Sequence, residues 1–302
     1  MAQAIRSADL VTLSAGDLQL DLAPAVGGGI AGFKWRGIDL FRPADPHGLA
    51  TKNPLGLGSF PMVPFSGRIA NGRFEFGGRI VNLLPKLANQ DHALHGQGWQ
   101  RMWTCTARSA NKAQLCFDHP LGEWPWAYRA EQSFDLRENR LIQTLSLENL
   151  SDTPMPAGLG LHPYFPRTAD MQLRAQVDGY FPNDIQMLPG ARTPPPKAWD
   201  WAHGMTLSPP IDHQFTGWDG RAEIWWPSRG VHVAMTTVPP LDYLVVYAPP
   251  GQDYACIEPV SHANNGLNRS ANGTQDGMKV LAPGQRMTIC VTLEITSLNS
   301  GE

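Results

Sequence analysis

The sequence predicts an all-β protein, a large antiparallel β-sandwich that forms a single domain over residues 1–302. Segments in which apolar and polar residues alternate with the period of a strand are spread over the whole chain, and no run of a dozen residues shows the 3.6-residue period of a helix. Glycine (30 residues) and proline (27 residues) are abundant, which favours short strands joined by turns. Because there is no repeat and no clear linker, we expect about 15 or more strands in one layered domain.

Strand segments are expected throughout the chain. The clearest is 287–295, where apolar and polar side chains alternate without interruption. The others, in chain order, are 18–22, 38–41, 74–76, 80–81, 103–117 with a turn at 110–111, 141–147, 222–226, 231–235 and 243–247.

Glycine and proline punctuate these segments. Asn71-Gly72 predicts a hairpin turn that joins strands at 68–69 and 74–76, and Gly77-Gly78 predicts a second turn. The stretch 181–210 is rich in proline and lacks periodicity. Because Trp199 and Trp201 lie inside it and require burial, we expect an ordered wrap over the surface.

Three glycines near the N-terminus, Gly27, Gly29 and Gly32, have the GxGxxG spacing of dinucleotide-binding loops. That motif requires a helix after the glycines, and none is indicated here. We therefore interpret the segment as a bulged turn between strands.

Composition excludes several classes of protein. Hydrophobic residues make up 42% of the chain and charged residues 17%, which is typical of a globular protein. The 24 basic and 27 acidic residues give a net charge of −3, which argues against a nucleic-acid partner. No apolar stretch reaches about 18 residues, and no signal peptide is indicated. We expect a cytoplasmic protein without a membrane partner.

The histidines and cysteines do not predict a metal site. His92 and His95 have HxxH spacing, but neither a helix nor a nearby carboxylate supports it. Gly96 and Gly98 are instead expected to leave room for a ligand near the backbone of His95. The four cysteines, Cys105, Cys116, Cys256 and Cys290, form no CxxC motif. For Cys105 and Cys116 we expect buried thiols, the alternative being that they face each other across a hairpin.

Five polar residues from five separate segments are candidates for a functional site. They are Arg68 in SGRIANGR, His95 in HALHGQGW, His162 in GLGLHPYF, Asp212 in IDHQF and Glu258 in CIEPVSHANN. Glu258 follows apolar strand residues, where a carboxylate is costly unless it is paired or used. A site assembled from different strands of one sheet has this distribution in sequence.

Each candidate also has a structural interpretation. An arginine beside a turn is commonly solvated, although the apolar, glycine-containing approach to Arg68 argues against this. His95 and His162 fit a role as buried, backbone-bonded histidines, and Asp212 fits the cap of a turn.

Together the five residues suit a neutral, hydroxyl-rich ligand. Aromatic faces stack on sugar C–H surfaces, while Asp, Arg and His side chains hydrogen-bond hydroxyls, and the chain has 10 tryptophans. A glutamate and a histidine supply the base and acid that chemistry at neutral pH requires. Serine hydrolase, P-loop and EF-hand motifs are absent from the sequence.

The chain resembles the aldose 1-epimerase (galactose mutarotase) family from about residue 27 to residue 295. The matching pieces, in order, are FPMVPFSGRIANGRF, HALHGQGWQ, GLGLHPYF, IDHQF, CIEPVSHANNG and LAPGQRMTICVTLEI. The resemblance implies a galactose mutarotase-like β-sandwich. It also implies an isomerase that interconverts the α and β anomers of a free aldose without a cofactor or a metal.

The resemblance also implies roles for the five residues. Glu258 takes the proton from the C1 hydroxyl, and His162 protonates the ring oxygen. The ring opens, the C1–C2 bond rotates, and reclosure from the other face inverts C1. His95 binds the sugar and polarises the region near the ring oxygen, while Arg68 and Asp212 hold hydroxyls.

One position departs from the family pattern. The family commonly has asparagine directly before the arginine, and here the residue is Gly67. A side-chain amide contact to the sugar is therefore expected to be absent, and substrate preference is expected to shift.

Three alternatives remain open. A mutarotase of a sugar phosphate requires clustered arginines at the site, for which the candidates are Arg68, Arg73, Arg79 and Arg101. A non-catalytic carbohydrate-binding protein requires no acid/base pair. A glycosidase or lyase requires two carboxylates, for which the candidates are Glu258 and Asp212. In each case we expect a sugar as partner, bound by a monomer or homodimer.

Overall fold

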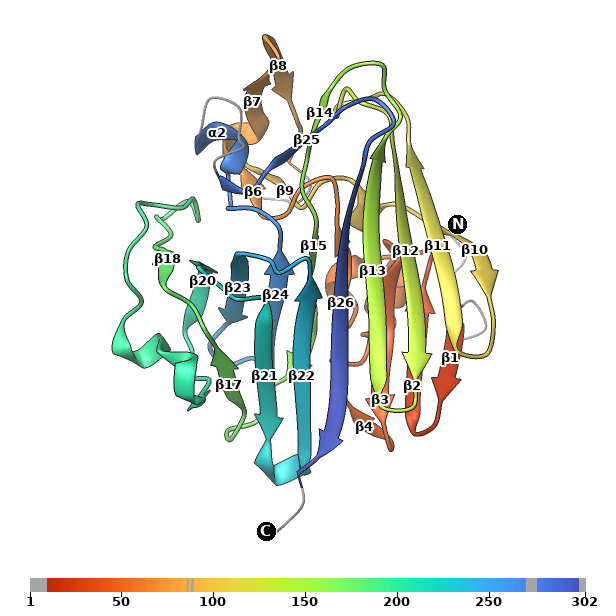
Figure 1. Cartoon of the computed structure of the whole chain (residues 1–302), viewed down its shortest axis with the longest axis vertical. Coiled ribbons are helices and arrows are strands. Elements are labelled where there is room, and N and C mark those ends of the chain that lie inside the picture. Colours follow the sequence, from red (N-terminus) through yellow and green to blue (C-terminus); the bar gives the residue numbers. More distant parts are fainter. Residues whose placement is uncertain (1–9, 86, 88–89, 270–275, 299–302) are drawn as a thin grey trace.

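The computed structural model describes residues 10–85, 87, 90–269 and 276–298, and it is built almost entirely from antiparallel strands (Figure 1). The predicted all-β sandwich is confirmed. The first nine residues, which entered the search for a signal peptide, lie outside the described residues. None of the helices in the described part of the chain has the length and apolarity to cross a membrane.

A nine-stranded sheet spans the width of the molecule (Figure 1). Its longest strand is the C-terminal one, where the alternation predicted for 287–295 places every second side chain in the core. In spatial order the strands are β10 (Thr104–Arg108), β11 (Lys112–His119), β12 (Tyr128–Arg137), β13 (Arg140–Asn149), β26 (Arg286–Ser297), β22 (Val231–Val238), β21 (Arg221–Trp226), β17 (Gln172–Ala175) and β19 (Met205–Thr206).

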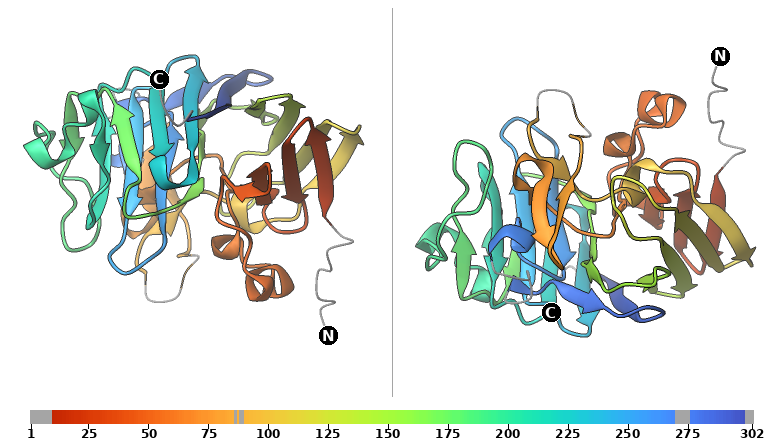
Figure 2. Two further views of the ribbon diagram at one scale, coloured as in Figure 1. Left: turned by 90° about the horizontal axis from the view of Figure 1, so that it is seen from below. Right: turned by 90° about the horizontal axis from the view of Figure 1, so that it is seen from above.

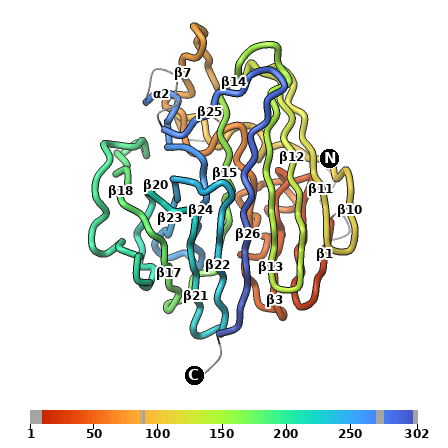
Figure 3. Tube along the Cα trace, viewed as in Figure 1, coloured from red at the N-terminus to blue at the C-terminus, as the bar shows by residue number. Residues whose placement is uncertain are grey.

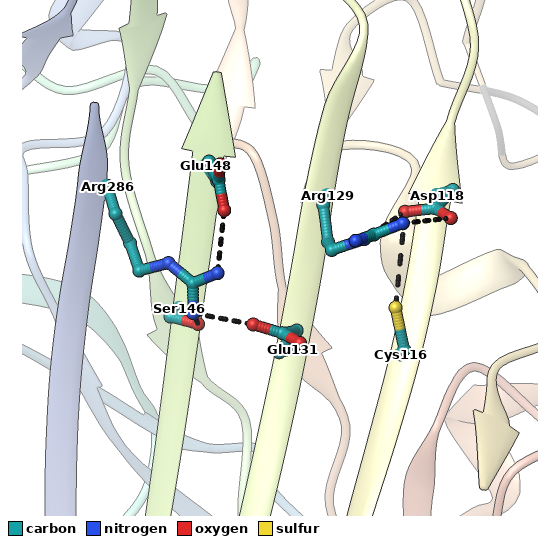
Figure 4. Close-up of polar contacts among 7 residues, drawn as sticks. All are labelled: Cys116, Asp118, Arg129, Glu131, Ser146, Glu148 and Arg286. Carbon is teal, nitrogen blue, oxygen red and sulfur yellow. Dashed lines mark hydrogen bonds and ion pairs between the residues drawn. The ribbon is translucent and has the colours of Figure 1, made fainter. Parts of the chain in front are cut away.

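The solvent face of this sheet carries a row of alternating charges across four strands (Figure 4). Arg286 pairs in register with Glu148, Glu148 with Arg129, and Arg129 with Asp118. Arg286 donates hydrogen bonds to Glu148 and to Glu131, and Arg129 donates two to Asp118. Opposite charges across neighbouring strands stabilise their pairing, and the charges keep this face in water. The opposite face of the sheet therefore forms the core.

Two smaller sheets pack against the apolar side of the large one (Figure 2). The first contains β1 (Val11–Ala15), β2 (Leu18–Ala23), β3 (Gly29–Trp35) and β4 (Ile38–Asp39), which is shorter than the expected 38–41. The second contains β18 (Gly179–Phe181), β20 (Ile211–Thr216), β23 (Tyr243–Ala248), β24 (Tyr254–Val260), β15 (Gly160–Leu161) and β5 (Pro61–Met62), with β16 (Tyr164–Pro166) paired to β24.

Short elements complete the fold. Three two-stranded pairs are β6 (Arg68–Ile69) with β9 (Ala93–Leu94), β7 (Arg73–Phe76) with β8 (Arg79–Asn82), and β14 (Met155–Ala157) with β25 (Lys279–Leu281). The α-helices are α1 (Pro46–Thr51) and α2 (Gly266–Arg269). The 3-10 turns are η2 (Pro54–Gly56), η3 (Ala70–Gly72), η4 (Gly98–Gln100), η5 (Lys197–Trp199), η6 (Trp201–His203) and η7 (Pro227–Arg229).

The proline-rich stretch wraps the outside of the molecule as predicted. In Figure 3 the tube runs around the outer edge of the seven-stranded sheet between β18 and β20. Trp201 is buried, and the ring of Trp199 packs against Tyr180 and Phe215. These two tryptophans hold a segment that has little regular structure of its own.

The predicted hairpin at Asn71-Gly72 is wrong. Both residues have positive φ, as the sequence suggests, but β6 pairs with β9 rather than with β7. The backbone N–H of Asn71 donates to Nδ1 of His92, and the N–H of Ala70 donates to the side chain of Asn265. These side chains redirect the chain, and the hairpin forms one turn later, at Gly77-Gly78 between β7 and β8.

Two other expectations have mixed outcomes. The bulged turn at Gly27 is confirmed, because the register of β2 and β3 shifts near Leu22 and no helix follows the glycines. The four thiols are free, but only Cys256 is buried. The prediction of buried thiols is wrong for Cys105 and Cys116, which are partly exposed on the paired strands β10 and β11.

Candidate active site

A cavity of about 300 Å³ opens between the seven-stranded sheet and the β6–β9 pair. The structure brings all five predicted site residues to its wall, although they come from segments far apart in the sequence. Other lining residues are Ser66, Gly67, Tyr164, Asn183, His213, Gln214, Tyr247, Tyr254 and Asn264. The volume lies at the lower end of the range of about 300–1,000 Å³ that is usual for small-molecule sites.

Strand register builds the floor of the cavity. Asp212 of β20 lies opposite Tyr247 of β23, and Gln214 lies opposite Val245, which is in turn opposite Glu258 of β24. Residues directly opposite each other in neighbouring strands project from the same face of a sheet. Two rows of side chains from three strands therefore point into one space.

His162 and Glu258 touch at this floor. Nε2 of His162 lies 3.3 Å from Oε1 of Glu258, and the two residues are only 7% and 3% exposed. The backbone N–H of His162 donates to the carbonyl of Phe60, and the imidazole stacks on Tyr164 with ring centres 4.7 Å apart. The histidine is therefore held by its neighbours with Nε2 aimed at the carboxyl group.

Burial moves the two pKa values in opposite directions. Loss of water raises the pKa of Glu258 well above 4.5, an effect that the charge of Asp212 increases and that of Arg68 opposes. Loss of water lowers the pKa of His162 from 6.5 to about 3. The pair therefore holds one proton from about pH 3 to a pH well above 4.5. Movement of that proton over 3.3 Å exchanges the acid and the base.

His95 is fixed as a neutral hydrogen-bond donor. Its backbone N–H donates to the carbonyl of Gly67, and its ring Nδ1 accepts from the N–H of Gly67 at 3.1 Å. Because Nδ1 is an acceptor, the ring proton lies on Nε2. Burial, together with His162 and Arg68, lowers the pKa of His95 well below 6.5. The ring therefore offers an N–H to a ligand.

The expectation that the glycines after His95 leave room for a ligand is wrong. Gly96 has φ +71°, and a Cβ there would lie 2.2 Å from the carbonyl oxygen of Val63. A Cβ at Gly98 would lie 2.3 Å from the side chain of Val63. Both glycines permit close backbone packing that sets the position of His95. Nδ1 of His92 accepts a hydrogen bond from the backbone N–H of Asn71, outside the cavity wall. The two histidines of the HxxH spacing therefore do not form a shared metal site.

Arg68 and Asp212 stand at the cavity wall without a salt bridge between them. Burial lowers the pKa of Arg68, while the charges of Asp212 and Glu258 oppose that change. Burial raises the pKa of Asp212, and Arg68 opposes it. The two side chains thus interact across space, which leaves a cationic donor and an anionic acceptor available to hydroxyl groups.

Several lining residues were not identified from the sequence. Tyr247 and Tyr254 add aromatic faces, while Asn183 and Asn264 add amides. Only the strand alternation around Tyr247 gave a usable signal, because the other positions depend on contacts between distant segments.

The arginine cluster that a sugar-phosphate site requires is not formed. Of the four candidate arginines, only Arg68 lines the cavity. Two of the others are exposed on the β7–β8 hairpin, and the fourth is exposed after η4.

One trio of groups near the floor has metal-ligand chemistry. The ligand atoms of His162, Cys256 and Glu258 all lie within 4.8 Å of one another and are buried. The guanidinium of Arg42 lies over the ring of Tyr164. Burial raises the pKa of the Cys256 thiol well above 9.0, a change that the charge of Arg42 opposes, and burial lowers the pKa of His162, a change to which Arg42 adds. A fixed cation beside the trio opposes binding of a second cation, so the arrangement suits proton transfer better than metal binding.

Comparison with known proteins places this geometry in a family. The sequence model of the family "Aldose 1-epimerase" matches residues 9–294. The uncharacterized protein YphB of Escherichia coli (strain K12) is 34% identical over 305 residues, which cover 95% of this chain and 98% of YphB.

Solved structures agree with this match. The crystal structure of a candidate aldose 1-epimerase from Escherichia coli K12 superimposes with a TM-score of 0.88 and 32% identity, over 96% of this chain and 99% of that one. A galactose mutarotase-like protein from Clostridium acetobutylicum has the same fold, with a TM-score of 0.87 and 21% identity over 98% of both chains. The chain therefore belongs to the aldose 1-epimerase family.

Proposed function

We propose that the protein is a mutarotase that interconverts the α and β anomers of a free monosaccharide. The observation that carries the proposal is the contact between Nε2 of His162 and Oε1 of Glu258 at 3.3 Å, at the floor of a cavity of monosaccharide size. Anomerisation needs a base at the C1 hydroxyl and an acid at the ring oxygen. These two oxygens are bonded to the same carbon, so an acid and a base in contact suit them.

Ring opening uses the imidazolium and carboxylate form of the pair. Glu258 takes the proton of the C1 hydroxyl, the C1–O5 bond breaks, and His162 gives its proton to O5. The product is the open-chain aldehyde, and the pair now holds its proton on Glu258. Rotation about C1–C2 presents the other face of the aldehyde. On closure His162 takes the proton from O5, and Glu258 returns one to the C1 oxygen.

The remaining residues hold the sugar. His95 donates from Nε2, Arg68 donates and Asp212 accepts. The three residues can therefore bind sugar hydroxyls both as acceptors and as donors of hydrogen bonds. The rings of Tyr247 and Tyr254 offer flat faces to sugar C–H groups. These contacts fix the sugar while the C1–C2 bond turns.

A free aldose suits the cavity better than a sugar phosphate. One guanidinium, that of Arg68, faces two carboxyl groups, those of Asp212 and Glu258, among the lining residues. A dianionic phosphate there would meet charge of its own sign. The proposal therefore takes a neutral sugar as substrate.

Polarimetry tests the proposal. Fresh α-glucose, α-galactose, pentoses and deoxyhexoses are followed with and without the protein. We expect at least one sugar to reach its anomeric equilibrium faster than it does spontaneously. If every sugar in the panel relaxes at its spontaneous rate while ligand-observed NMR detects binding, the protein is a carbohydrate-binding protein and the mutarotase proposal is wrong.

A further inference from the structure

Two loops face each other at the cavity wall, and polar contacts join them residue by residue. The N–H of Ser66 donates to Nε2 of His262 at 2.9 Å, and the N–H of Arg68 donates to Oδ1 of Asn264 at 2.5 Å. The N–H of Asn264 donates to the buried side chain of Gln214 at 2.6 Å. This network holds the loop that carries Arg68 against the loop that follows β24.

Gly67 lies between these contacts, and the space above its Cα is occupied. Its φ is +66°, and a Cβ placed on it would lie 2.6 Å from Oδ1 of Asn264. Both residues line the cavity next to Arg68. The side chain of Asn264 therefore fills the position that a side chain at residue 67 would take.

The amide of Asn264 has a defined orientation. A backbone N–H can bond only to the oxygen, so the contact with Arg68 fixes Oδ1 on that side and Nδ2 on the other. Nδ2 carries two N–H groups, of which one bonds the carbonyl of Met187 at 3.3 Å. Asn264 is 8% exposed and lines the cavity. The second N–H has no hydrogen-bond partner among the described residues, which leaves it free for a ligand in the cavity.

We propose that Asn264 binds the sugar and supplies, from the loop after β24, the amide contact that Gly67 lacks. This inference rests on the proposed function. The ligand is a hydroxyl oxygen of the aldose beside Arg68 and Asp212, away from the reacting carbon at His162. The amide donates a neutral hydrogen bond there, next to one cation and one anion, so it contributes to the choice of sugar rather than to proton transfer.

Kinetics of single variants test this role. Asn264→Gly is expected to lower kcat/KM for the sugar found by polarimetry about tenfold, mainly through a higher KM, because one hydrogen bond to substrate is lost. Asn265→Gly is the matched control. Asn265 also accepts from a backbone N–H of the same loop, at 3.0 Å from Ala70, but it does not line the cavity. The control should keep kcat/KM within about twofold of wild type.

An exchange of the two residues tests the shared space. Gly67→Asn alone should lose more activity than Asn264→Gly, because the new Cβ meets Asn264. The double variant G67N/N264G should be at least about tenfold more active than G67N, since asparagine tolerates positive φ and the obstructing amide is gone.

The outcomes separate this inference from the proposed function. Wild-type kinetics in Asn264→Gly, or an equal loss in Asn265→Gly, would overturn the assignment of Asn264 as a sugar contact. A double variant no more active than G67N would contradict the inference that the side chain of Asn264 occupies the space of a side chain at residue 67. Failure of the wild-type protein to accelerate any sugar would instead defeat the mutarotase proposal.

Discussion

The ring nitrogen Nδ1 of His95 accepts a hydrogen bond from the backbone N–H of Gly67, while the backbone N–H of His95 donates to the carbonyl of Gly67. This reciprocal pair ties a site residue to the loop that precedes Arg68. It also decides which ring nitrogen carries the proton, so the chemical role of His95 follows from a backbone contact.

His95 should therefore stay neutral at every pH at which the protein is active. Burial lowers the pKa of His95 well below 6.5, and an Nδ1 acceptor requires the Nε2–H tautomer. Long-range ¹H–¹⁵N NMR of the imidazoles should give one resonance pair of this tautomer that is constant from pH 5 to pH 8. A titration midpoint near 6.5 for this ring would contradict the assignment.

Gly96 is expected to be irreplaceable for a steric reason. Gly96→Ala should lower the free energy of unfolding by at least about 2 kcal/mol, because its Cβ would lie 2.2 Å from a carbonyl oxygen at positive φ. Gly77→Ala is the control, since Gly77 has φ +59° but open space around its Cα. It should lose only about 1 kcal/mol. Urea denaturation measures both, and equal losses would show that packing against Val63 is unimportant.

Much of the fold could be predicted because strand periodicity is a local property. The terminal strand β26 shows this most clearly, since its side chains alternate between core and solvent over its length. The turn at Gly77-Gly78 was also read correctly from two residues. The sandwich needs many such segments, and each carries its own signal.

The failures come from contacts between distant segments. Asn71-Gly72 has the positive φ values of a hairpin turn, but the side chains of His92 and Asn265 bind the neighbouring backbone and direct the chain elsewhere. Asn264 was not identified as a site residue because nothing in its own segment shows that it faces Gly67. The five main candidates were visible in their own segments, but the role expected for each came from the resemblance to a family.

The free energy of unfolding should fall as the pH drops from 6.5 towards 4. Burial lowers the pKa of His262 to about 4, so the unfolded chain binds a proton in this window and the folded chain does not. At pH 5 this group alone costs about 2 kcal/mol relative to neutral pH. The lowered pKa values of His95 and His162 also reduce the free energy of unfolding as the pH falls, whereas the raised pKa of Glu258 increases it.

Urea denaturation at pH 7 and pH 5 measures this dependence. His262→Gln should show a smaller difference between the two pH values than the wild-type protein, since glutamine does not titrate. An unchanged difference would mean that His262 is not held neutral by the fold.

The pH dependence of kcat/KM should follow the proton shared by His162 and Glu258. The one-proton form of the pair is active. A second proton is bound only near pH 3, because burial lowers the pKa of His162 to about 3. The shared proton leaves only at a pH well above 4.5, because burial raises the pKa of Glu258. The acid limb of the profile should therefore lie near pH 3, and an acid limb with its midpoint at the ordinary histidine pKa would be inconsistent with a buried pair.

The most direct test removes the base and keeps the shape of the site. Exchange between α and β anomers is measured by NMR magnetisation transfer at pH 7 with wild-type protein and with Glu258→Gln, and sugar binding is followed by saturation transfer. We predict that Glu258→Gln lowers the exchange rate by at least about 100-fold and still binds the sugar. A variant that retains wild-type exchange would contradict the central claim that Glu258 and His162 carry the proton transfers.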